Sequence, residues 1–66
     1  MNGFEAKHKE GLYDGVAMYV QEAYDKLDNQ PIKVASDYDL MYKLNQILTD
    51  LTDERSSLRE IWDAND

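Results

Sequence analysis

The sequence predicts an all-α fold, an antiparallel two-helix hairpin that dimerises into a four-helix bundle. Apolar residues recur at steps of three and four in both halves of the chain, which is the period of a helix face. A single proline, Pro31, separates the halves and pushes the residue before it out of the α region. With 66 residues and no cysteine, the chain forms one domain near the lower size limit for a stable core.

The first helix is expected to run from about residue 4 to about residue 27. Acidic Glu5 falls in its first turn and Lys26 in its last, which suits the helix dipole. The residues at helical spacing form a broad apolar face: Leu12, Val16, Tyr19, Val20, Ala23 and Leu27.

Two glycines, Gly11 and Gly15, interrupt this helix pattern. Each costs about 1 kcal/mol relative to alanine inside a helix. Because they are four residues apart, they fall on one side of the helix. They indicate either a site of close backbone contact or a bend or break, with a frayed segment before Gly11.

The connection is expected to cover residues 28–35. Ile32 and Val34 alternate with Lys33, so we expect them to tuck down as an extended plug over the open end of the hairpin. Ser36 is a good N-cap for the second helix, and Asp39 stands at the capping-box place.

The second helix is expected to run from about residue 36 to about residue 62. Its polar stretch, residues 52–57, contains no Gly or Pro and keeps the heptad phase, which favours one continuous helix. The heptad row is Leu40, Leu44, Ile47, Leu51, Leu58 and Ile61, with Glu54 at the skipped place. Met41, Leu48 and Trp62 form a second row beside it.

A stripe this wide is more than one neighbouring helix covers. The sequence therefore predicts a protein interface formed by these nine side chains and one tyrosine: Leu40, Met41, Leu44, Ile47, Leu48, Leu51, Leu58, Ile61, Trp62 and Tyr42. Tyrosine is enriched at interfaces because it combines a large apolar area with a polar tip. Trp62 is either a cap on the end of the bundle or an anchor for a partner.

The composition excludes several classes of function. The net charge of −7 and the scattered basic residues argue against direct binding to nucleic acid or to an anionic membrane. No apolar window is long enough to span a membrane, and the N-terminus lacks the apolar run of a signal peptide. A cytoplasmic location is the resulting expectation.

Chemistry at a catalytic or metal site is not expected. Glu5 and His8 have the spacing of a carboxylate–histidine metal motif, but the chain has no second histidine, so an ordinary solvated pair is favoured. With no cysteine and one imidazole, nucleophilic catalysis is equally poorly supported. The sequence predicts no enzyme, no metal and no cofactor.

The remaining function is interaction with other proteins. We expect a small acidic helical protein that binds itself and a larger protein, which it regulates or inhibits. Size, acidity and the lack of cysteine are typical of phage and mobile-element accessory proteins. Two alternatives stay open: a structural module whose dimer is its function, and an acidic mimic of DNA that inhibits a nucleic-acid-binding protein.

Overall fold

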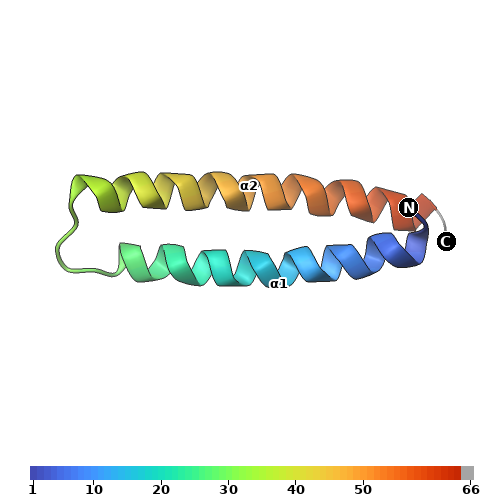
Figure 1. The fold of residues 1–66 in the computed structure, drawn as a ribbon, viewed down its shortest axis with the longest axis horizontal. Helices are drawn as coiled ribbons and strands as arrows, with labels where there is room; N and C mark the ends of the chain where they lie inside the picture. The colour runs from blue at the N-terminus through green and yellow to red at the C-terminus, as the bar shows by residue number, and fades with distance from the viewer. Residues whose placement is uncertain (65–66) are drawn as a thin grey trace.

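The computed structural model describes residues 1–64, which form two long helices joined in a hairpin (Figure 1). Helix α1 spans Gly3–Asp28 and helix α2 spans Ala35–Ala64. The all-α prediction of two packed helices is confirmed for these residues. The molecule is a rod of 49 × 14 × 12 Å with a radius of gyration of 15.1 Å. A compact domain of this length has a radius of gyration of about 11 Å, so much of each helix is left at the surface.

Side-chain and backbone caps define the ends of α1. The Asn2 Oδ1 atom accepts a hydrogen bond of 2.8 Å from the Glu5 backbone N–H, which satisfies one of the free donors of the first turn. At the other end, the Asn29 N–H donates to the Asp25 carbonyl at 2.9 Å. Pro31 follows two residues later and prevents the helix from continuing.

Of the interpretations of the two glycines, the break with a frayed segment is wrong, the close contact is not made within the hairpin, and the bend stays a prediction. The helix is continuous from Gly3 to Asp28, so Gly11 does not end a frayed segment. A Cβ atom built at Gly11 or at Gly15 would have nothing within 4 Å beyond the local helix backbone, so neither glycine permits a close approach of another element. The glycines therefore lower helix propensity without a packing role in the hairpin.

Helix α2 begins one residue earlier than expected, and its cap differs. The Val34 carbonyl accepts from the Asp37 N–H at 3.0 Å, which places Val34 at the cap position. The Asp37 Oδ2 atom in turn accepts from the Val34 N–H at 2.9 Å. The prediction of Ser36 as N-cap with Asp39 as its capping-box partner is therefore wrong. Asp37 takes the capping role because its carboxylate reaches back to the free N–H at the start of the helix.

The connection between the helices does not plug the end of the hairpin. Ile32 is 79% exposed and Val34 is 56% exposed, so the expected apolar plug is not formed. Six residues, 29–34, suffice to join the helices, and the Lys33 Nζ atom donates to the Gln30 carbonyl at 3.3 Å within this turn. The loop therefore adds little to the core.

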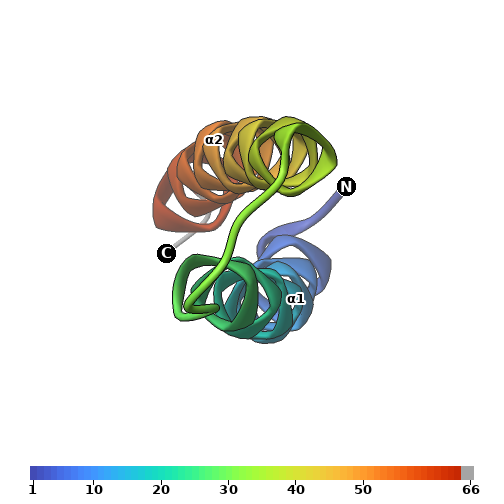
Figure 2. The same cartoon turned by 90° about the vertical axis from the view of Figure 1, so that its left-hand side faces the viewer.

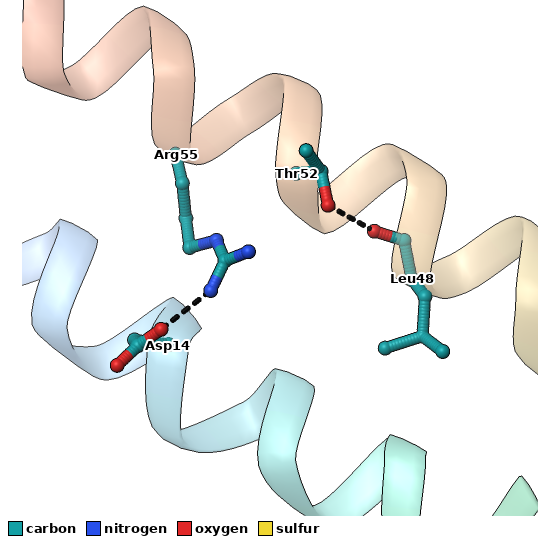
Figure 3. Close-up of polar contacts among 4 residues, drawn as sticks. All are labelled: Asp14, Leu48, Thr52 and Arg55. Atoms are coloured by element: carbon teal, nitrogen blue, oxygen red, sulfur yellow. Dashed lines mark hydrogen bonds and ion pairs between the residues drawn. The ribbon is translucent and has the colours of Figure 1, made fainter.

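Helix α2 passes without a break through its polar stretch. The Thr52 hydroxyl donates to the Leu48 carbonyl at 2.9 Å (Figure 3), and the Thr49 hydroxyl donates to the Asn45 carbonyl at 3.1 Å. Both hydroxyls are thus satisfied within the helix itself, in the i−4 arrangement common for threonine. The stretch needs no partner to remain helical.

The core lies between α1 and α2, whose axes cross at a shallow angle (Figure 2). The side chains that face the other helix, here called the seam, recur with a heptad period and are buried or half-buried. On α1 they are Ala6, Glu10, Tyr13, Ala17, Val20, Tyr24 and Leu27; on α2 they are Met41, Leu44, Leu48, Leu51, Arg55, Leu58 and Trp62. Among the described residues only Ala6, Ala17, Met41 and Leu58 are buried, so the core is thin.

Leu58→Ala should lower the free energy of unfolding by about 2–5 kcal/mol, the usual cost of truncating a buried leucine. Leu58 is 5% exposed in the seam, and a fold this small has only ~5 kcal/mol of stability in total. Urea unfolding followed by circular dichroism measures the change. Ile32→Ala, at an exposed loop position, is the control and should change stability by less than about 0.5 kcal/mol. Equal effects of the two substitutions would contradict the seam.

Gly11→Ala should raise the stability by roughly 0.5–1 kcal/mol, because it lowers the entropy of the unfolded chain and meets no neighbour. Thermal unfolding of the variant beside the wild type measures this. A lower melting temperature would show that the glycine has a contact that the isolated hairpin lacks.

Candidate protein-interaction surfaces

Two polar pairs interrupt the seam near the open end of the hairpin. Arg55 occupies the seam between Leu51 and Leu58, and its Nη1 atom lies 2.5 Å from Asp14 Oδ1 (Figure 3). The Arg55 side chain is 28% exposed and the Asp14 side chain 64%, so this ion pair lies at the edge of the core. An ion pair so open to water contributes little net stability, and it forms only in an alignment that brings Arg55 of α2 beside Asp14 of α1.

The second pair lies closer to the chain ends. The Trp62 indole N–H donates to the Glu10 carboxylate, which satisfies the polar tip of a half-buried ring. The Lys7 Nζ atom lies 5.2 Å from the centre of the Trp62 ring, and the Arg59 guanidinium carbon lies 5.7 Å from it. Trp62 therefore packs between the helices at the open end, and its ring and indole N–H are engaged within the hairpin.

A shallow pocket of about 300 Å³ opens beside these pairs. Its lining is polar: Glu10, Asp14, Thr52, Arg55, Ser56 and Arg59. Three of the charged groups in this lining already have partners within the hairpin. Arg55 contacts Asp14, and Glu10 accepts a hydrogen bond from Trp62. Among residues 1–64 no group of three or more metal-type ligands comes together, and His8 is exposed on α1.

One flank of the hairpin carries a set of exposed apolar side chains from both helices. The seam residues of each helix form two rows, each with a spacing of seven residues. In an antiparallel pair, the residues directly before one of these rows lie on the same side of both helices. They include Val16 on α1 and Leu40 and Ile47 on α2. Leu12 and Tyr19 lie one turn before and after Val16. We call these five residues the apolar side; their exposed fractions run from 40% for Val16 to 76% for Tyr19.

The other flank, the opposite side, is mainly polar. Asp14, Gln21, Thr52 and Arg59 follow seam residues and emerge there. Three large exposed side chains are spread along it: Met18, Tyr38 and Tyr42. The two flanks therefore differ in chemistry, although they belong to the same pair of helices.

The structure divides the ten residues predicted as a protein interface. Met41 and Leu58 are buried inside the hairpin, and five others are half-buried in or beside the seam: Leu44, Leu48, Leu51, Ile61 and Trp62. Leu40 and Ile47 are exposed on the apolar side, and Tyr42 is exposed on the opposite side. Much of the predicted stripe is thus used to hold α1 against α2.

Sequence reasoning missed the polar members of the seam. Arg55 lies seven residues after Leu48 and seven before Trp62, which is the signal that places it in their row. Glu10 likewise lies seven residues before Ala17. Charged side chains are normally assigned to the surface. Only the seven-residue spacing therefore indicates that Arg55 and Glu10 belong to the seam.

None of the helices in residues 1–64 is long and apolar enough to cross a membrane. No family model, no curated protein and no solved structure matches this chain.

Arg55→Leu should leave the stability unchanged or raise it, because a leucine completes the apolar row and the open ion pair contributes only ~0–1 kcal/mol. Chemical unfolding at low and at high salt measures the difference. Asp14→Asn is the matched variant and should lower stability by less than about 1 kcal/mol, an effect that disappears at high salt. A loss of several kcal/mol in Arg55→Leu would mean that the pair is essential to the fold.

Proposed function

We propose that this protein is a non-enzymatic interaction protein, an acidic helical hairpin that dimerises and binds a larger protein, whose activity it regulates or inhibits. The observation that carries the proposal is the combination of a thin core with the uncovered apolar side. Four buried residues, none of them a large side chain that is completely shielded, are a small core for two helices. Association with another helical surface would supply what the hairpin lacks.

The dimer part of the proposal rests on helix geometry. A helix pair has one shared seam, and side chains beside it stay in water unless further helices cover them. Leu40 and Ile47 remain about half exposed in the hairpin, at 48% and 44%. Two hairpins packed face to face into a four-helix bundle would cover such positions on both chains.

The partner-binding part rests on the opposite side. Tyr38 and Tyr42 are both largely exposed there and lie four residues apart, one turn of α2. Aromatic side chains of this kind are the usual anchors of protein interfaces, while charges at the rim mainly tune the rate of association. We therefore assign the contact with the larger protein to the exposed aromatic residues of this side.

A mimic of DNA is the second candidate function, and the charge distribution supports it. The apolar side carries three lysines and three carboxylates, so the excess negative charge that gives the chain its net −7 does not lie on it. An elongated acidic surface of this kind attracts proteins that bind a phosphate backbone. Salt dependence separates this candidate from the first.

Tyr42→Ala should weaken the capture of a partner from a lysate of the source organism at least tenfold. Truncating an aromatic hot spot typically costs about 2 kcal/mol or more of binding free energy, and a tenfold change needs only about 1.4 kcal/mol. Raising the salt from roughly 50 mM to roughly 500 mM should change the captured amount little, because apolar contacts are not screened. Quantitative pull-down with tagged wild type and variant measures both effects.

Asp39→Asn, at an exposed position on the same helix, is the matched control and should retain the partner. Trp62→Ala is unsuitable, since it removes contacts that hold the hairpin itself. Capture that is lost at high salt but tolerates Tyr42→Ala would replace the first proposal with the DNA mimic. A lack of any specific partner would leave self-assembly as the function.

A further inference from the structure

We infer that the apolar side is covered by a second copy of this chain, so that it forms the dimer interface and leaves Tyr42 facing outward. The inference rests on the proposed function, because it names which surface makes the dimer. The residues expected to contact the second copy are Leu12, Val16, Tyr19, Leu40 and Ile47. The opposite side is then free for the larger protein.

The exposed area matches what such a dimer requires. The described hairpin exposes 5047 Å², whereas a compact monomer of 7.7 kDa is expected to expose about 4,300 Å². The excess of roughly 700 Å² per chain is close to the ~800 Å² that each partner contributes to a standard protein interface. One additional layer of helices on one flank would remove this excess.

The charges on this flank favour a second copy over a strongly charged partner. Lys9 and Glu54 directly precede seam residues. The other charged residues of this side lie one or two turns from the apolar set: Glu5, Lys26, Lys43 and Asp50. Three lysines thus balance three carboxylates on the apolar side, in a chain with a net charge of −7. Two copies can meet here without bringing their excess negative charge together.

The placement of the apolar residues also suits self-association. Both helices contribute, because Leu12, Val16 and Tyr19 come from α1 while Leu40 and Ile47 come from α2. A two-fold axis lying between the paired faces makes each chain present the same patch to the other. The product is a four-helix bundle whose added core layer is this side of each hairpin.

Sedimentation equilibrium of the full chain tests the interface. The wild type should be a dimer at micromolar concentration, and Ile47→Glu should raise the dissociation constant of the dimer at least about 100-fold, since each interface then buries two unpaired charges. Tyr42→Glu is the matched control on the opposite face of the same helix and should leave the dissociation constant within about threefold. A monomeric wild type, or equal effects of the two variants, would overturn the inference.

A second measurement does not depend on the variants with added charge. Ser57 lies three residues after Glu54, on the apolar side, whereas Ser56 lies seven residues after Thr49, on the opposite side. The chain has no cysteine, so Ser57→Cys and Ser56→Cys each give a single labelling site. In electron paramagnetic resonance, the two nitroxides of the dimer should be closer at position 57 than at position 56. The reverse order would place the dimer on the other flank and overturn the inference.

The two proposals can fail separately. A dimer with the expected label distances but no captured partner would contradict the binding of a larger protein and leave the interface intact. A monomer that captures a partner through Tyr42 would contradict the interface and leave the binding function intact.

Discussion

The structure depends on a limit set by helix packing, since two helices share only one seam. Each seam residue can be covered by the facing helix, whereas residues beside the seam stay in contact with water. The chain carries apolar side chains at both kinds of position, as Leu48 in the seam and Ile47 beside it illustrate. The rod shape, the thin core and the exposed apolar side all follow from this limit. A further layer packed on the hairpin, such as the helices of a second copy, would bury both rows.

The polar pairs in the seam act on alignment more than on stability. Arg55 and Glu10 occupy places that leucine would fill with a larger gain from apolar burial. Polar residues in an otherwise apolar heptad row are known to select register and partner number at a cost in stability. Here both pairs lie toward the open end, where no loop constrains how α1 and α2 are aligned. We interpret the two polar pairs as the contacts that select the register of α1 against α2 at that end.

The sequence could predict the hairpin but could not decide how its apolar rows are divided. Leu44, Leu51 and Leu58 belong to the seam under either of two neighbouring heptad phases. The phase that adds Leu40 and Ile47 and the phase that adds Met41 and Leu48 differ by one residue, and both place apolar groups on a helix face. In the structure the second phase faces α1, whose seam contains the small Ala6 and Ala17. Single-sequence periodicity contains no information on how two such faces are rotated against each other.

Local signals near helix ends were similarly ambiguous. Ser36 and Asp37 are both good residues for the start of a helix, and the outcome depended on which backbone N–H the Asp37 carboxylate could reach. Gly11 and Gly15 indicated a break that the continuous helix overrides, because packing along the whole length of α1 outweighs a local loss of about 1 kcal/mol per glycine.

The division of charge between the two flanks links the fold to the proposed function. If the excess negative charge were spread over the apolar side, the repulsion between two copies would oppose the burial of Val16, Leu40 and Ile47. In the proposed dimer, the excess negative charge lies on the outer surfaces instead, where it would keep the bundle soluble and favour encounters with basic partners. An outward Tyr42 then adds the apolar contact that electrostatic attraction alone does not provide. In the proposed arrangement, the same pair of helices assembles through its neutral apolar side and presents Tyr42 outward for recognition.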